Sequence, residues 1–148
     1  MRRALGITLV TLALMVPLGC SDHHSVTQPA EQGFFGTWEW VTSVGGYTGH
    51  DVRTPASEGY TIRFTLERDG HYQVFRNGAL VLSDVFTIHR EEQPVSPGYV
   101  DIIHYSGMAR GEFGCLYPVQ AISLVTPDSL SLADMAADLY RHRCARRE

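Results

Sequence analysis

The 148-residue sequence contains no lysine, and all twelve of its basic residues are arginine. Sixteen Asp and Glu residues outnumber them and give a formal net charge of −4. Residues 1–19 carry Arg2 and Arg3, so removal of this segment would leave the rest of the chain at −6. Because nucleic-acid binding needs clustered cations to neutralise phosphates, we predict no nucleic-acid partner.

The basic residues cluster only at the C-terminal end, at Arg141, Arg143, Arg146 and Arg147. We interpret this cluster as the solvated side of a final strand, because long charged side chains usually stay in water. The alternative is a patch that binds an anionic ligand or a membrane surface.

The sequence also lacks the common catalytic motifs. It has no phosphate-cradling glycine loop, no Gly-x-Ser-x-Gly and no His-Glu-x-x-His. Asp101 and His104 are three residues apart, so on one strand they point to opposite faces. His71, His89 and His104 are equally compatible with core or surface positions. We therefore predict no catalytic residue, no cofactor and no metal site.

The apolar run at residues 4–18 is too short for a comfortable membrane span, which needs about 20 residues. It follows Arg2 and Arg3, as in a secretory signal peptide. It ends in Pro17-Leu18-Gly19-Cys20, which resembles a bacterial lipobox. The resemblance implies cleavage after Gly19 and acylation of Cys20, and several acyl chains give a stable membrane anchor.

The predicted organisation is a lipoprotein signal peptide at 1–19, a flexible tether at 20–33 and one domain at 34–148. The tether is polar, and its His23-His24 pair is interpreted as solvated linker, with metal binding as the alternative. Ser21 after the lipidated cysteine resembles the outer-membrane sorting choice. We therefore expect a bacterial envelope protein that is lipid-anchored in the outer membrane.

Only three cysteines are present, which leaves Cys115 and Cys144 once Cys20 is assigned to lipid. An even pair in an oxidising compartment predicts a Cys115–Cys144 disulfide. Closing a loop of about 30 residues would contribute roughly 3–4 kcal/mol in the chain-entropy model. The alternative is a thiolate site that uses both cysteines and His142, which is two residues from Cys144.

The domain shows eight strand-like segments and no sustained apolar period of 3.6 residues. Residues 60–67 alternate apolar and polar side chains, and Asp69-Gly70 and Asn77-Gly78 are strong hairpin signals. An all-antiparallel chain with short hairpins predicts an all-β, up-and-down barrel, whose closure removes exposed edges. The predicted strands are 36–44, 59–67, 71–76, 79–90, 99–106, 119–126, 129–133 and 138–145.

The first strand carries Gly36-Thr37-Trp38-Glu39-Trp40, and the Arg-rich segment ends the domain. Gly-x-Trp at the head of the first strand, short antiparallel strands and an arginine-bearing last strand resemble the lipocalin-like barrels of the calycin group. The run from Gly36 resembles that of small bacterial lipocalin-like lipoproteins. The resemblance implies that Arg141 or Arg143 lies across Trp38 and closes one end of the barrel, a contact worth about 0.5–2 kcal/mol.

Two functions are compatible with such a barrel, because eight strands enclose either packed side chains or one small ligand. The first is a binder of a small apolar or amphipathic molecule. The alternative is an envelope structural or protein-interaction module with a filled barrel, contacting a partner through the loops at 45–59 or 107–118. Calycin relatives include isomerases, so an enzyme of that type is a third and more distant alternative. Sequence alone leaves open which faces of residues 79–106 point inward. The predicted ligand-lining residues are aromatic, and each is equally suited to plain packing: Trp40, Tyr60, Phe64, Tyr72 and Phe86.

Overall fold

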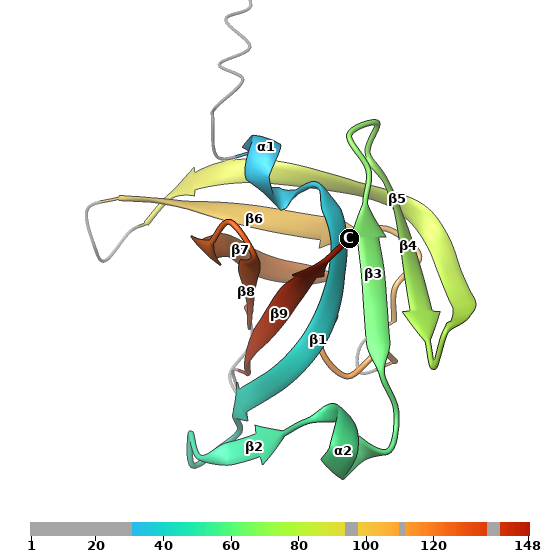
Figure 1. The fold of residues 1–148 in the computed structure, drawn as a ribbon. Coiled ribbons are helices and arrows are strands. Elements are labelled where there is room, and N and C mark those ends of the chain that lie inside the picture. Colours follow the sequence, from blue (N-terminus) through green and yellow to red (C-terminus); the bar gives the residue numbers. More distant parts are fainter. Residues whose placement is uncertain (1–30, 94–97, 110–111, 136–139) are drawn as a thin grey trace, which may run out of the picture.

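The computed structural model describes residues 31–93, 98–109, 112–135 and 140–148. In this part of the chain nine strands form one antiparallel sheet in the order β2-β1-β3-β4-β5-β6-β7-β8-β9. β1 (Gly36–Gly45) also pairs with β9 (Arg141–Arg147), which closes eight of the strands into a barrel (Figure 1). The predicted all-β, eight-stranded up-and-down barrel is confirmed. The other barrel strands are β3 (Ile62–Leu66), β4 (His71–Arg76), β5 (Ala79–Glu92), β6 (Tyr99–Tyr105), β7 (Val119–Thr126) and β8 (Ser129–Asp134).

Tight hairpins set the register of the neighbouring strands. Asn77 and Gly78 have φ of 51° and 81°, the left-handed pair that a two-residue hairpin turn requires. Between β3 and β4, Gly70 has φ 88°, and the Glu67 N–H donates to the His71 carbonyl at 2.9 Å. Both predicted hairpins are therefore confirmed.

The segment expected to be an open loop at 45–59 contains two short elements. β2 (Asp51–Arg53) pairs with the end of β1 outside the barrel, and α2 (Pro55–Glu58) follows it. The α2 turn begins at a Thr54 capping box, has Pro55 in its first turn and ends at Gly59, which has φ 75°. Another short helix, α1 (Glu31–Phe34), precedes β1 (Figure 1).

The barrel interior is filled by alternating side chains of the strands. On β3 the buried residues Ile62, Phe64 and Leu66 alternate with partly or fully exposed ones, as their sequence pattern predicts. The core also contains residues from all seven remaining barrel strands, from α1 and from the segment before β7: Phe34, Trp38, Trp40, Tyr72, Val74, Phe86, Ile103, Tyr105, Met108, Phe113, Cys115, Leu116, Ile122, Leu130, Leu132 and Cys144.

The structure assigns the faces that the sequence left open. Phe86 of β5 and Ile103 and Tyr105 of β6 belong to the core. β5 and β6 pair over seven positions up to Glu92 and Tyr99, whereas β6 and β7 pair over four. The β5–β6 hairpin therefore extends past β7, as Figure 1 shows. Residues 89–92 of β5, which lie in or next to this extension, are exposed.

Candidate functional site: the barrel interior and the outer face of β7, β8 and β9

One end of the barrel is closed by an arginine over the first tryptophan. The Arg146 guanidinium lies 4.2 Å from the Trp38 ring centroid, and the Trp38 side chain is fully buried. The prediction that Arg141 or Arg143 makes this contact is wrong. Trp38 pairs in register with Arg146, whereas Arg141 and Arg143 alternate outward from β9.

Arg146 also ties the chain entering the barrel to the last strands. Its guanidinium donates to the carbonyl oxygens of Gly33 at 2.7 Å, Phe35 at 3.0 Å and Pro127 at 2.9 Å. The planar five-donor group of arginine suits such a multiple contact, which a lysine could not reproduce. The barrel plug expected from the Gly-x-Trp resemblance is therefore present with a different arginine.

Gly36 is required by this plug. Its φ of 130° lies in the region that favours glycine, and an added Cβ would lie 2.6 Å from the Arg146 Nη1 atom. Both the backbone and the packing therefore select glycine two residues before Trp38.

The predicted ligand-lining aromatics are part of the packed core. Trp40, Phe64, Tyr72 and Phe86 are at most 6% exposed, and Tyr60 packs against them. The Trp40 and Tyr60 rings stack with centroids 5.9 Å apart. Burial raises the pKa of Tyr72 to about 12, and its hydroxyl donates to the Ser106 carbonyl. Four of the five aromatics thus belong to the core, and Tyr60 packs against it.

A buried chain of polar groups lies at the other end of the interior. The Trp40 indole N–H donates to Ser43 Oγ at 2.9 Å, and Ser43 Oγ is 2.6 Å from His142 Nδ1. His142 Nε2 is 3.0 Å from Asp134 Oδ1, which also accepts from Gln120 Nε2 at 2.9 Å. These contacts form one continuous run of hydrogen bonds from the indole through the Ser43 hydroxyl and the His142 ring to the Asp134 carboxyl group.

Ser43, His142 and Asp134 have the order of a hydrolytic triad, but their surroundings do not suit catalysis. Ser43 is 1% exposed, and its oxygen already accepts the indole proton. A nucleophile must reach its substrate and be activated by a base. Here the buried polar groups link β1, β7, β8 and β9 inside the barrel. Tyr117 and Tyr140 stack on His142 with centroids 6.2 Å away.

Sequence reasoning missed this polar chain. Its members are far apart in sequence, and no short motif joins Ser43 to His142. Asp134 directly continues the inward alternation of Leu130 and Leu132 on β8, which is the signal that could have revealed a buried carboxylate.

The predicted Cys115–Cys144 disulfide is wrong for this structure, in which both cysteines are free thiols and fully buried. Parity and compartment supported the prediction, but neither places two sulfur atoms at bonding distance. Burial raises the pKa of both thiols, which keeps them protonated. His142 is held by Ser43 and Asp134, and the described residues contain no group of metal-ligating side chains.

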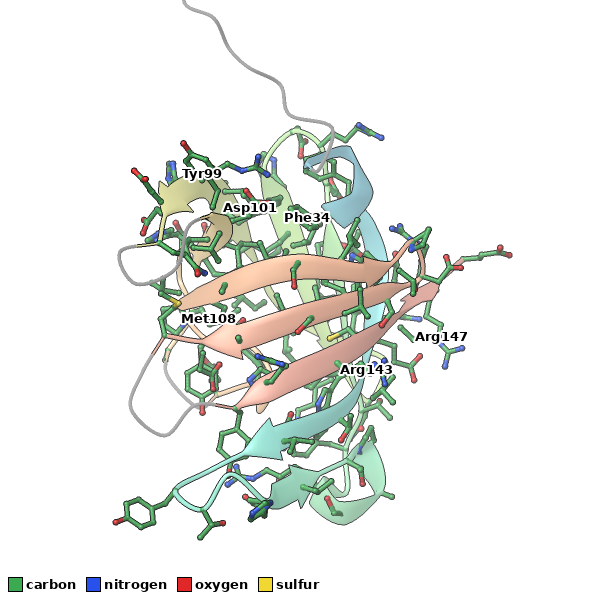
Figure 2. The ribbon with its side chains drawn as sticks, turned by 90° about the vertical axis from the view of Figure 1, so that its left-hand side faces the viewer. Phe34, Tyr99, Asp101, Met108, Arg143 and Arg147 are labelled. Atoms are coloured by element: carbon green, nitrogen blue, oxygen red, sulfur yellow. The ribbon has the colours of Figure 1, made fainter. Side chains whose placement is uncertain are left out.

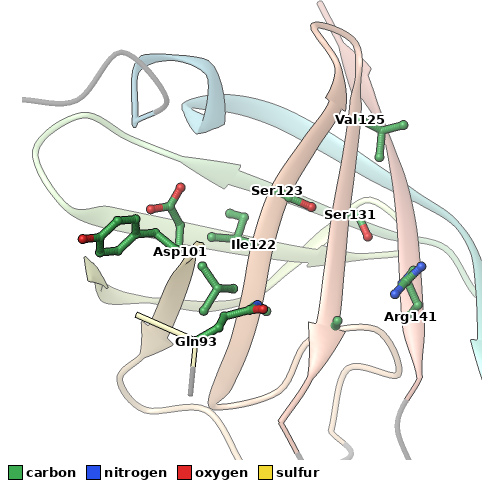
Figure 3. Close-up of a pocket in the computed structure, with 11 residues that line it drawn as sticks. Gln93, Asp101, Ile122, Ser123, Val125, Ser131 and Arg141 are labelled. Carbon is green, nitrogen blue, oxygen red and sulfur yellow. The ribbon is translucent and has the colours of Figure 1, made fainter. Parts of the chain in front are cut away.

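The outer face of β7, β8 and β9 carries shallow depressions. Figure 2 looks onto this face, where the three strands cross the front of the barrel. A depression of about 500 Å³ starts where β6 separates from β7 and ends at Arg141 (Figure 3). Small residues of β7 and β8 form the floor of this depression. We call this floor the outer trough; its residues are Ala121, Ser123, Ser131 and Ala133.

Arg141 also lines two adjoining depressions of about 340 and 380 Å³ beside β1. The first of these includes Arg143 and Thr42, and the second includes Val44. The three depressions therefore meet at Arg141, between the outer trough and β1.

The remaining predictions for the N-terminal part, including the signal peptide, Cys20 and most of the tether, lie outside the described residues. Within those residues, no helix has the length and apolar character needed to cross a membrane. No protein-family model, curated protein or solved structure matches this chain. The fold and contacts thus define the class as a closed eight-stranded antiparallel barrel with a core of buried side chains.

Proposed function

We propose that this chain is a lipid-anchored bacterial envelope protein whose barrel is a rigid scaffold for binding another protein through its outer surface. The observation that carries the proposal is the interior, which is occupied by the chain's own aromatic and aliphatic side chains. A small apolar ligand would need the space that Trp40, Phe64 and Tyr72 fill, each at most 2% exposed. The interior therefore supports the interaction module over the ligand carrier.

The lipid anchor in this proposal rests on the lipobox-like run before Cys20. Acylation at that cysteine would hold the barrel near the envelope membrane through the polar tether. We assign no catalytic activity to the barrel, because its serine, histidine and aspartate contacts lie in the interior.

Two experiments in the native bacterium test the two parts of the proposal. For the anchor, metabolic labelling with an alkyne fatty acid should mark the wild-type protein, and Cys20→Ala should lose both the label and membrane retention. For the interaction, a photo-cross-linking amino acid at Ser131 in the outer trough should yield one defined protein adduct. The same residue at exposed Ser83 on β5 should yield none. Equal adducts at both positions, or none at Ser131, would contradict an outer-surface interaction site.

A further inference from the structure

Arg141 and Arg143 differ from the other arginines that the structure describes. Arg53, Arg90, Arg146 and Arg147 form ion pairs with carboxylates. Three more arginines lie over aromatic rings, at positions 63, 68 and 76. Among the described residues, Arg141 and Arg143 have neither kind of partner. Both are exposed cations without a partner in the described part of a chain that has a net negative charge.

The neighbours of the two arginines are short and uncharged. Arg141 lies opposite Ala133 on β8 and Val44 on β1. Arg143 lies opposite Ser131 on β8 and Thr42 on β1. Both guanidinium groups therefore stand beside the outer trough without a bulky neighbour in register, and the hydroxyl groups of Ser131 and Thr42 lie on the same face.

The spacing of the two cations matches that of an extended chain. Residues two apart on a strand are roughly 6.6–6.8 Å apart, and their side chains share a face. A partner segment in the same extended conformation presents alternate side chains at the same period. Two carboxylates separated by one residue can thus meet both guanidinium groups, each of which accommodates a carboxylate with two parallel hydrogen bonds.

We infer that the outer trough binds an extended segment of a partner protein that carries two acidic residues in an acidic-x-acidic pattern, with Arg141 and Arg143 each holding one carboxylate. This inference rests on the proposed interaction function and names the chemistry of its partner. An anionic membrane surface fits less well, because lipid-binding patches use about four to eight cations. Here Arg146 and Arg147 are already engaged by other groups of the protein.

The test uses the full-length lipidated protein in detergent micelles and fluorescein-labelled peptides of seven residues. Fluorescence anisotropy at about 50 mM salt compares a Glu-Val-Glu peptide with a Gln-Val-Gln peptide and with one whose two Glu residues are adjacent. We expect the Glu-Val-Glu peptide to bind at least about tenfold more tightly than either control.

Variants of the protein assign the binding to the two arginines. Arg141→Gln with Arg143→Gln should weaken binding of the Glu-Val-Glu peptide about tenfold or more. The matched control, Arg63→Gln with Arg68→Gln, removes the same charge from β3 and the turn after it and should change binding less than about twofold. Circular dichroism and thermal unfolding establish that each variant is folded.

Three results would overturn the inference. The first is equal affinity for the Glu-Val-Glu and adjacent-Glu peptides. The second is an equal loss of affinity for the Glu-Val-Glu peptide in the two double variants. The third is Arg141- and Arg143-dependent binding of phosphatidylglycerol vesicles without binding of any peptide, which would identify a membrane surface instead. If the peptides fail while the Ser131 cross-link persists, the proposed interaction function stands and the acidic-x-acidic partner does not.

Discussion

Replacing Arg146 with alanine should destabilise the barrel far more than replacing its neighbour Arg147. Arg146 contributes a cation–π contact with buried Trp38, worth about 1 kcal/mol. It also donates to two part-buried carbonyl groups, at about 1 kcal/mol each after allowance for a side chain that is 28% exposed. The sum is about 3 kcal/mol. For a domain of this size that corresponds to a fall in Tm of roughly 10 °C.

The assay is urea and thermal unfolding of the purified protein, followed by tryptophan fluorescence and circular dichroism. Arg147→Ala is the matched control, because its ion pair with Glu39 is at the surface, where solvent screens it, and should contribute little to stability. Arg146→Lys should recover part of the loss, since it keeps the charge but not the fork of donors. An Arg146→Ala variant as stable as Arg147→Ala would refute the plug.

Four further outcomes follow from the same contacts. Gly36→Ala should lower the free energy of unfolding by about 1–3 kcal/mol, because of its φ of 130° and the 2.6 Å approach to a guanidinium nitrogen. Ser43→Ala should cost about 1–3 kcal/mol, because it leaves a buried indole N–H and an imidazole nitrogen without their partner. Burial raises the pKa of Tyr72 from its ordinary value of 10.0 to about 12 in the folded protein. The stability that comes from keeping this hydroxyl protonated is therefore complete below pH 10 and is lost as the pH rises toward 12. Tyr72→Phe should make the fall in the free energy of unfolding over this pH range shallower. Cys115 and Cys144 should both resist a thiol reagent at about pH 8 in the folded protein and both react after unfolding.

Each of these outcomes has a control. Gly49→Ala, at φ 72° with open space around its Cβ, should cost less than Gly36→Ala. Denaturant titrations give the effect of Ser43→Ala, and an unchanged midpoint would contradict a stabilising role for the polar chain. The free energy of unfolding, measured from pH 8 to 12, gives the pH dependence that Tyr72 contributes. Identical slopes for the wild type and Tyr72→Phe would contradict this contribution. Fewer than two reactive thiols at positions 115 and 144 in the unfolded protein would contradict the free cysteines.

Local patterns were sufficient to predict the barrel, because the information that fixes hairpins and strand faces is local. Asn77-Gly78 can form its left-handed turn whatever surrounds it, and β3 alternates in a way that permits one buried face. Closure could be predicted because a sheet of consecutive antiparallel strands removes its exposed edges when its first and last strands pair. The two-sided apolar segment of β6 was harder, since Ile102 and Ile103 are both buried on opposite faces.

Contacts between distant residues could not be predicted in the same way. The choice of Arg146 over Arg141 or Arg143 depends on the register of β9 against β1, and a shift of one residue reverses the face of every side chain. The polar chain from Ser43 to Asp134 depends on the closed barrel itself. The disulfide prediction failed because a count of cysteines contains no distances.

The central claim is that the barrel interior is filled by the protein's own side chains and that function lies on the outer surface. Native mass spectrometry of the protein, gently extracted from its bacterial membrane, tests this claim most directly. The account predicts the mass of the processed polypeptide with its acyl groups and no stoichiometric small molecule. A retained apolar or amphipathic molecule, released only when the barrel unfolds, would contradict it.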